Sequence, residues 1–230
     1  MVTRRTIARR SRTSEHGGFG APSKMPGLAY GIAATKCKTG GKLRHVENST
    51  CADCYALKGR YTIPAGTRRG TVAAAHERRL AAFERDPVAW QVSIIRDLRA
   101  ATAETAPEHR YFRWHDSGDL QGPTHLRAIV AIAQALPQWR FWLPTREYAL
   151  ARLVVGSSCP DNLVIRVSDA MVNGKPPRFA THSSGVYSNK RPNAETADKT
   201  SCPAYKQGGV CGDCRACWDK EVLRVIYPLH

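Results

Sequence analysis

Apolar positions recur at two different spacings along this chain of 230 residues. From residue 68 to 84 they follow the three-to-four spacing of one helix face, and the same spacing continues after Asp86-Pro87 with Trp90, Ile94 and Leu98. Proline is favoured in the first turn of a helix, so this dipeptide predicts the start of a second helix. Two consecutive amphipathic helices are therefore expected before the middle of the chain.

The next hundred residues alternate short apolar runs with helical patterns. Such an alternation is typical of parallel strands joined by right-handed helical crossovers. The sequence therefore predicts an α/β fold, built either as a partial (β/α) barrel or as an open parallel sheet. We expect strands at 110–114, 139–143 and 163–167, and helices at 123–136 and 147–155.

Composition divides the chain into three parts. The first has five arginines, several glycines and no apolar periodicity, which indicates a disordered basic arm. The second begins with a Gly- and Lys-rich loop system at 24–66, with one short strand near 27–34. The third has irregular character and ends in a short helix or strand within 218–226. The expected boundaries are 1–23 for the arm, 24–172 for the α/β core and 173–230 for the irregular C-terminal segment.

The charge of the chain favours an anionic partner. There are 35 Lys and Arg against 19 Asp and Glu, so the formal net charge is +16. Nucleic acid is the first polyanion to consider, and the alternative is a basic protein whose charge only aids solubility. No apolar stretch approaches the roughly 20 residues that span a bilayer, and no secretory signal opens the chain. We therefore expect a cytoplasmic protein without a membrane partner.

Seven of the eight cysteines fall into two sets. In a reducing cytoplasm, closely spaced cysteines bind metal or carry out redox chemistry more often than they form disulfides. Three thiolates leave a metal centre with an open position, whereas four close it. The first cysteine set is Cys37, Cys51 and Cys54, and the second cysteine set is Cys202, Cys211, Cys214 and Cys217.

The second cysteine set has the spacing of an iron–sulfur ligand loop. Its last three members repeat at C-x2-C-x2-C, as in the run that wraps a cluster in bacterial ferredoxins. Cys202 is the natural fourth ligand. The spacing favours a [4Fe–4S] cluster over zinc, which also accepts four cysteines but is more often held by two separated C-x2-C pairs.

The first cysteine set has three members, which suits a cluster with one iron free of protein ligands. A free iron can chelate the amino and carboxylate groups of S-adenosylmethionine, and an electron from the cluster can then cleave the sulfonium. The alternative is a zinc site that His45 completes. His45 and Cys159 are the two residues able to close the site.

Polar residues follow each of the three expected strands. Because the carboxyl ends of parallel strands meet at one edge of a sheet, function gathers there in α/β folds. The alternative is that these residues only cap the next helices. Arg146 suits a carboxylate or phosphate, because its guanidinium makes bidentate contacts. We expect one cavity to be faced by His115, Asp116, Asp119, Thr145, Arg146 and Ser168; Glu147 and Asp169 adjoin them.

Five segments together resemble a family of poorly characterised bacteriophage gene products, over roughly residues 23–220. The Cys-Tyr-Ala ending of the first cysteine set is also similar to the cluster loop of radical S-adenosylmethionine enzymes, whose partial (β/α) barrels suit the strand–helix rhythm. If the chain is phage-encoded, the expected location is the host cytoplasm. The segments are 23–27, 37–43, 51–59, 112–119 and 141–146.

The resemblance to the radical enzymes implies roles for several residues, although two features differ. The cysteine loop is longer, with thirteen residues between Cys37 and Cys51, and the usual Gly-Gly-Glu motif is absent. Ser117-Gly118-Asp119 can replace that motif, since glycine permits close backbone approach and a carboxylate accepts hydrogen bonds from an amino group. The implied catalytic residues are Asp119, Arg146 and His115, and the implied cofactor-binding residues are Tyr55, Ser117, Gly118, Asp119, Thr145 and Ser168.

Three functions are compatible with these observations. The first is a radical-type iron–sulfur enzyme with [4Fe–4S] clusters, S-adenosylmethionine, a reductant protein as partner and a substrate that includes nucleic acid or nucleotides among its candidates. The second is a zinc-stabilised nucleic-acid-binding protein without catalysis. The third is an iron–sulfur protein whose clusters serve structure or electron transfer.

Overall fold

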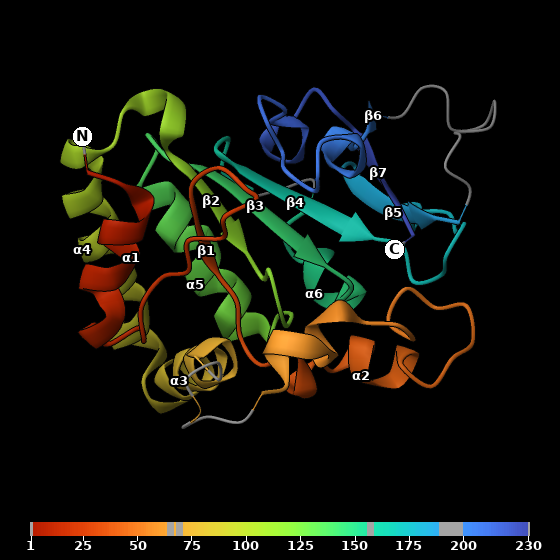
Figure 1. Cartoon of the computed structure of the whole chain (residues 1–230), viewed down its shortest axis with the longest axis horizontal. Helices are drawn as coiled ribbons and strands as arrows, with labels where there is room; N and C mark the ends of the chain where they lie inside the picture. The colour runs from red at the N-terminus through yellow and green to blue at the C-terminus, as the bar shows by residue number, and fades with distance from the viewer. Residues whose placement is uncertain (1, 64–66, 68–70, 156–158, 189–199, 230) are drawn as a thin grey trace.

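Seven parallel strands form one open sheet (Figure 1). The computed structural model describes residues 2–63, 67, 71–155, 159–188 and 200–229. The strand order is β1-β2-β3-β4-β5-β7-β6, and every neighbouring pair runs parallel. The strands are β1 Leu28–Tyr30, β2 Tyr111–Trp114, β3 Arg140–Thr145, β4 Leu163–Ser168, β5 Ser183–Tyr187, β6 Thr200–Ser201 and β7 Arg224–Pro228.

The prediction of an α/β fold with an open parallel sheet is confirmed, and the sheet does not close into a barrel. The short strand expected near 27–34 is β1, and the three later strands lie where the apolar runs predict them. The helix expected over 147–155 is shorter: the regular helix, α6, covers only Tyr148–Ala151. The helices are α1 Arg4–Arg10, α2 Thr39–Leu43, α3 Thr71–Arg85, α4 Pro87–Glu104, α5 Pro123–Ala135 and α6 Tyr148–Ala151.

The start of α4 shows how the sequence fixes a helix end. Asp86 adopts an extended conformation, and its carboxylate accepts hydrogen bonds from the N–H groups of Val88 and Ala89 at 3.0 and 2.9 Å. Pro87 occupies the first turn, where the missing N–H costs nothing. The helix predicted from Asp86-Pro87 therefore begins at the expected residue.

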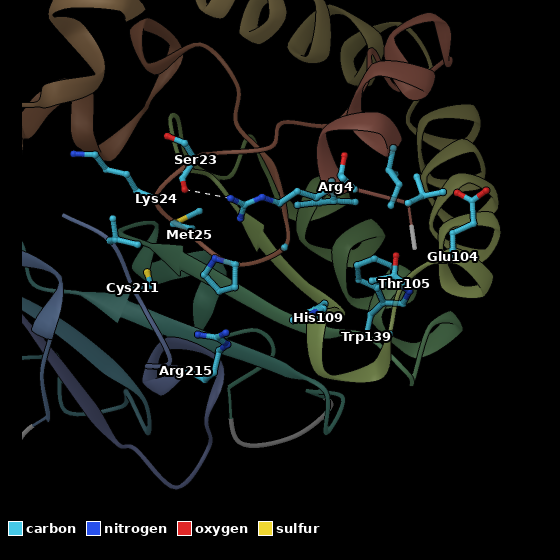
Figure 2. A pocket seen from close by; sticks show the side chains of 18 of the residues that line it. Arg4, Ser23, Lys24, Met25, Glu104, Thr105, His109, Trp139, Cys211 and Arg215 are labelled. Atoms are coloured by element: carbon cyan, nitrogen blue, oxygen red, sulfur yellow. Dashed lines mark hydrogen bonds between the residues drawn. The ribbon is translucent and has the colours of Figure 1, made fainter. Parts of the chain in front are cut away.

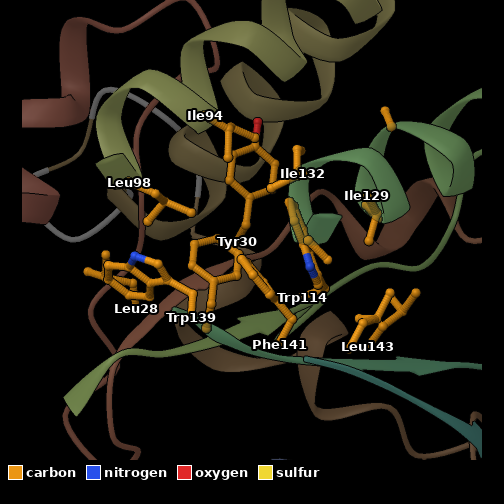
Figure 3. Packing of buried hydrophobic residues seen from close by; sticks show 14 of the residues in the cluster. Leu28, Tyr30, Ile94, Leu98, Trp114, Ile129, Ile132, Trp139, Phe141 and Leu143 are labelled. Atoms are coloured by element: carbon orange, nitrogen blue, oxygen red, sulfur yellow. The ribbon is translucent and has the colours of Figure 1, made fainter. Parts of the chain in front are cut away.

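The main core lies between α3, α4 and α5 and one face of the sheet (Figure 3). Three tryptophans, Trp90, Trp114 and Trp139, are almost completely buried there. The indole N–H of Trp90 donates to the Tyr30 hydroxyl at 2.7 Å, and that of Trp139 donates to the Thr102 hydroxyl at 2.9 Å, whereas the indole nitrogen of Trp114 has no partner within the described residues. The core supports β1, β2 and β3 from one side and leaves their carboxyl ends for the site described below.

The N-terminal segment, expected to be a disordered arm over 1–23, contains α1 and packs against the main core. Thr3 caps α1, and Ile7 on this helix is buried against the core. His16 stacks on Phe19 with ring centroids 4.3 Å apart, and both residues are buried. The local pattern does not predict this packing, because Ile7 among arginines and Phe19 among glycines carry little periodicity, yet both fill a hydrophobic gap beside α4.

The C-terminal segment is only partly irregular. Strands β5 and β7 extend the sheet beyond β4, whereas the second cysteine set lies in 3-10 turns between β6 and β7. These turns cover the second face of the sheet, where Tyr111, Trp142 and Trp218 form a small cluster. The region expected to be a final short helix or strand ends in β7. In the described part of the chain, no helix has the length and apolar character needed to cross a membrane.

Candidate functional site

A cavity of about 890 Å³ opens at the carboxyl ends of the parallel strands. Its wall includes the six residues that the strand-end argument placed on one cavity. It also includes all six residues that the resemblance assigned to a cofactor, three of which are strand-end residues as well, and all members of the first cysteine set. The roles of these residues stay predictions. The wall contains His115, Asp116, Asp119, Thr145, Arg146 and Ser168, then Tyr55, Ser117 and Gly118, then Cys37, Cys51 and Cys54.

Asp119 is buried and holds the turn that follows β3. Its carboxylate accepts hydrogen bonds from the Thr145 hydroxyl at 2.6 Å and from the N–H groups of Arg146 and Leu120 at 2.8 Å each. Burial raises the pKa of Asp119 to about 6, although these hydrogen bonds lower it. Both carboxylate oxygens thus already accept hydrogen bonds within the protein. Asp119 therefore positions the turn after β3, and its contact with the amino group of a cofactor stays a prediction.

Gly118 allows two loops to approach closely beside Asp119. Its φ is +81°, and an added Cβ would lie 2.4 Å from Cγ1 of Ile32 and 2.9 Å from the Ile32 carbonyl oxygen. The preceding Ser117 accepts a backbone hydrogen bond from Ile32 at 2.9 Å. A side chain at this position would therefore separate the ends of β1 and β2, as the predicted need for glycine indicates.

His115 and Asp116 carry buried polar atoms that lack partners within the described residues. Both ring nitrogens of His115 and Oδ1 of Asp116 are in this state. His115 has a left-handed backbone with φ of +50°, and its ring packs edge-on against His125 with centroids 5.3 Å apart. Burial, with smaller contributions from His125 and Arg113, lowers the pKa of His115 well below 6.5. The imidazole is therefore neutral at physiological pH.

The first cysteine set lies on a loop that is fixed to the sheet at two points. The carboxylate of Glu147, at the end of β3, accepts hydrogen bonds from the N–H and the hydroxyl of Thr39, both at 2.8 Å. Thr50 donates its N–H to the Ala170 carbonyl at 2.9 Å, next to the end of β4. These contacts place Cys37 and Cys51 over the carboxyl edge of the sheet.

The thiols of the first cysteine set face one another across Gly40. An added Cβ at Gly40 would lie 3.4 Å from Sγ of Cys51 and 3.8 Å from Sγ of Cys37, so only glycine leaves this space free. Burial, with smaller contributions from Asp119, Cys54 and Cys51, raises the pKa of Cys37 to about 12. Thiolates are favoured here only if a positive group offsets their mutual repulsion. A bound metal centre would do so, because it deprotonates its thiol ligands.

A buried ion pair closes the far side of the cavity. Arg224 of β7 contacts both carboxylate oxygens of Asp169, at 2.5 and 3.2 Å, and both residues are buried. An added Cβ at Gly185 would lie 2.6 Å from Asp169 Oδ2, so glycine makes room for the pair. Arg146 donates from Nε to the Asp169 carbonyl at 3.1 Å, which directs its side chain along the cavity wall.

The second cysteine set lies over β2, β3 and β4, on the face of the sheet opposite the one that packs against α3, α4 and α5. Burial raises the pKa of Cys217 to about 12. The charge of Cys202 also raises this pKa, whereas a hydrogen bond with Tyr227 lowers it. Burial also raises the pKa of Cys202 and Cys211, and the charge of Cys214 contributes in each case. The four thiols are therefore close enough to influence one another.

Arg166 fixes this second set to the sheet. It is completely buried in β4, and its guanidinium donates to the carbonyls of Cys217, Ala216 and Asp219 at 3.0, 2.6 and 2.8 Å. Sequence reasoning missed this residue, although a charged side chain inside the apolar run at 163–167 is an unusual signal. Arg113, Trp142 and Tyr227 were also missed; all three line the strand-end cavity.

Replacing Arg166 with Met is expected to loosen the second cysteine set. The change removes the guanidinium donor from the carbonyls of Cys217 and Asp219, at about 1–3 kcal/mol for each that water does not reach, while the Ala216 carbonyl keeps the N–H of Asp219. Hydrogen exchange at residues 216–219 should accelerate, and the thermal midpoint should fall. Arg127→Met, on the exposed face of α5, is the matched control and should change neither quantity. Unchanged exchange in Arg166→Met would contradict the anchoring role.

The donor chemistry of both sets suits a metal centre, but the side chains do not converge on a single ion. Across the residues that the structure describes, no group of three or more His, Cys, Asp or Glu side chains is arranged to hold one metal ion. Cys159 contacts the Leu163 carbonyl at 3.2 Å, at the amino end of β4, and so lies away from the first set. His45 is exposed beyond the end of α2. Metal binding by either set stays a prediction.

A second, smaller cavity of about 430 Å³ lies at the amino ends of the strands (Figure 2). It separates α1 and the end of α4 from the loop of the second cysteine set. Arg4 crosses its wall and donates to the Ser23 carbonyl at 3.2 Å, while Cys211 and Arg215 face it from the other side. This cavity shares none of the predicted strand-end residues.

A family model named Gene product 88 matches residues 2–220. The chain belongs to the Gene product 88 family. This agrees with the predicted resemblance to phage gene products, and the match extends through both cysteine sets. No curated protein and no solved structure matches the chain. The family assignment thus supports the predicted relationship and leaves the chemistry to be argued from the site.

Proposed function

We propose that this Gene product 88 family member is an iron–sulfur enzyme that uses S-adenosylmethionine in the manner of radical enzymes. The observation that carries the proposal is the shared cavity: three thiols and the polar residues of three strand ends line the same 890 Å³ space. Three protein ligands leave a metal centre one position for a small molecule. A [4Fe–4S] cluster bound there would supply an electron and an open coordination position.

The cavity residues have separate tasks in this proposal. Cys37, Cys51 and Cys54 hold the cluster, and Arg146 binds the carboxylate of the cofactor through its guanidinium. Asp119 keeps Arg146 in place, because its carboxylate accepts the Arg146 N–H. Tyr55 closes one wall, since its hydroxyl donates to the Asp116 carbonyl beside the first set.

The second cysteine set is proposed to hold a second cluster with a structural or electron-transfer role. Cys217 contacts the Tyr227 hydroxyl at 3.2 Å, and Tyr227 itself lines the strand-end cavity. One aromatic side chain therefore separates the second set from the space in which the first set lies. A reductant protein would deliver electrons at this face.

Zinc is the competing occupant of both sets. A single zinc ion draws four ligands to about 2.0–2.3 Å from one point. A cube distributes its thiolates over different irons and needs no such convergence. The consecutive C-x2-C-x2-C spacing of Cys211, Cys214 and Cys217 supports the cube. The iron–sulfur assignment is therefore preferred over the zinc-stabilised nucleic-acid-binding protein.

Metal analysis of matched cysteine variants tests the proposal. Anaerobically purified protein should contain iron and sulfide, and Cys54→Ser and Cys214→Ser should each lose about half of the iron. The reduced wild-type protein should cleave S-adenosylmethionine to deoxyadenosine and methionine. Cys54→Ser should abolish this cleavage, and electron paramagnetic resonance should still detect the other cluster.

Cys159→Ser is the control, because Cys159 belongs to neither set; it should keep full iron content and activity. If the purified protein contains zinc instead of iron, the enzyme proposal is wrong and the zinc-stabilised nucleic-acid-binding protein is the better hypothesis. Iron without binding or cleavage of S-adenosylmethionine would leave a structural or electron-transfer role.

A further inference from the structure

The positive charge of the chain is concentrated in its first part. Residues 1–63 contain twelve Lys and Arg against three Asp and Glu, whereas residues 71–104, which span α3 and α4, contain five of each. The net charge of +16 therefore does not cover the surface evenly. The layer formed by α3 and α4 has no net charge to attract a polyanion, whereas the N-terminal third attracts one.

Much of this charge surrounds the mouth of the strand-end cavity. We call residues 36–60 the cavity rim; they contain six Lys and Arg against two Asp and Glu. Thirteen residues between 34 and 56 line the cavity itself, so the basic side chains alternate with cavity wall. Figure 1 shows this segment, in orange around α2, at the end of the sheet toward which the arrows of β3 and β4 point. The exposed basic residues of the rim are Lys36, Lys38, Lys42, Lys58 and Arg60.

The rim also carries an exposed aromatic ring. Tyr55 is 55% exposed although it lines the cavity. Its hydroxyl donates to the Asp116 carbonyl, and its ring packs edge-on against Tyr61 with centroids 5.6 Å apart. The ring is thus held at a fixed orientation with an open surface. A fixed, open ring beside basic side chains is the arrangement on which unpaired bases stack.

We propose that the cavity rim binds single-stranded nucleic acid, with Lys36, Lys42 and Arg60 contacting phosphates and Tyr55 stacking on a base beside the cavity. This rests on the proposed function only in taking the cavity as the place of reaction. A single strand is preferred because the cavity is recessed below the rim, and a base inside a duplex cannot enter such a space without being extruded. Two acidic residues outside the rim, Asp116 and Asp119, line the cavity, so the phosphates lie on the rim and the base and sugar face inward.

Fluorescence anisotropy with a labelled 20-nucleotide single strand tests this inference. Single strands of DNA and of RNA are compared to determine which of the two the rim prefers. The matching duplex serves as competitor. The triple variant Lys36→Ala/Lys42→Ala/Arg60→Ala should bind at least tenfold more weakly at about 0.1 M salt. Its slope of log affinity against log salt should be shallower by about 2, at about 0.7 for each lost phosphate contact.

The control triple variant removes the same charge elsewhere. Arg85→Ala/Arg99→Ala/Arg127→Ala alters exposed positions on α3, α4 and α5 and should retain wild-type affinity within about twofold. Equal losses in both triples would show diffuse attraction and overturn the proposal. If Arg9→Ala/Arg12→Ala on the N-terminal segment causes the larger loss, binding lies at that segment and the rim assignment is wrong.

Variants of Tyr55 test the stacking contact. Tyr55→Ala should weaken single-strand binding by at least about fivefold, whereas Tyr55→Phe keeps the ring and should bind nearly as wild type. Equal effects of both variants, or a duplex that binds as tightly as the single strand, would overturn the stacking assignment. Circular dichroism confirms folding of each variant. Iron content, measured separately, reports on the proposed enzyme, so failure of one proposal is not failure of the other.

Discussion

Asp169→Asn is expected to destabilise the folded protein by about 3–5 kcal/mol, because it leaves the guanidinium of Arg224 buried without its counter-ion. Arg224 is 7% exposed and makes contacts at 2.5 and 3.2 Å with the two carboxylate oxygens. The effect should spread to the cavity, since the backbone of Asp169 accepts hydrogen bonds from Thr50 and Arg146. Urea unfolding followed by circular dichroism measures the change.

The double variant Asp169→Asn/Arg224→Met removes both charges and serves as the comparison. Replacing a buried pair by an apolar side chain is often close to neutral, so the double variant should recover most of the lost stability. Equal stability of the single and the double variant would show that the buried charge of Arg224 is not the cause of the loss.

Stability is expected to fall steeply below pH 6.5 because several histidines are buried in the neutral form. Burial lowers the pKa of His125 to about 3 and that of His76 to about 4, and it lowers the pKa of His115 well below 6.5. In the unfolded chain each titrates near 6.5. The unfolded state therefore binds more protons below that pH, so stability present above pH 6.5 is lost as pH falls toward each folded pKa.

The slope can be assigned to individual groups. Each buried histidine contributes about 1.4 kcal/mol per pH unit between its two pKa values. Asp119 opposes them, because its folded pKa of about 6 lies above the usual 3.8, and protonation between these values favours the folded state. Burial also lowers the pKa of His16, so the net slope between pH 6 and 4 is that of these three histidines and His16 less one carboxyl.

Urea unfolding at pH 8, 7, 6, 5 and 4 tests this assignment. His125→Phe keeps an aromatic ring between Phe83 and Trp90, and it should reduce the slope between pH 6 and 4 by about 1.4 kcal/mol per pH unit. His109→Phe, at an exposed position, is the control and should leave the slope unchanged. An unaltered slope in His125→Phe would refute the buried neutral histidine as its source.

The strand ends could be predicted from sequence because two local signals agree there. Apolar runs mark the strands, and a polar group follows each run, so parallel pairing alone brings His115, Thr145 and Ser168 to one edge. Gly118 could be assigned a close backbone approach for the same reason. These predictions depend on periodicity and topology, and neither requires knowledge of distant side chains.

Other features depend on contacts that no local pattern encodes. Ile7 lies among arginines and Phe19 among glycines, and only the gap beside α4 explains their burial. The charge of Arg166 is unusual within an apolar run, but its hydrogen-bond partners are unknown until the turns of residues 203–218 are placed over it. Asp119 has the composition of a ligand-binding residue, but three protein donors already surround it. The sequence identifies Asp119 by its place after β2, whereas its hydrogen bonds to the turn after β3 are known only from the structure.

The loop of the first cysteine set has a consequence for the order in which the protein is made. Thr50 binds backbone carbonyls at Asp169 and Ala170, which are 119 and 120 residues further along the chain. At roughly 5–20 residues per second, a ribosome needs on the order of 6–24 s to add that stretch. During this interval Cys51 and Cys54 have no sheet edge to close over them. The thiols are thus uncovered while synthesis continues, and completion of β4 supplies the carbonyls that hold their loop against the sheet.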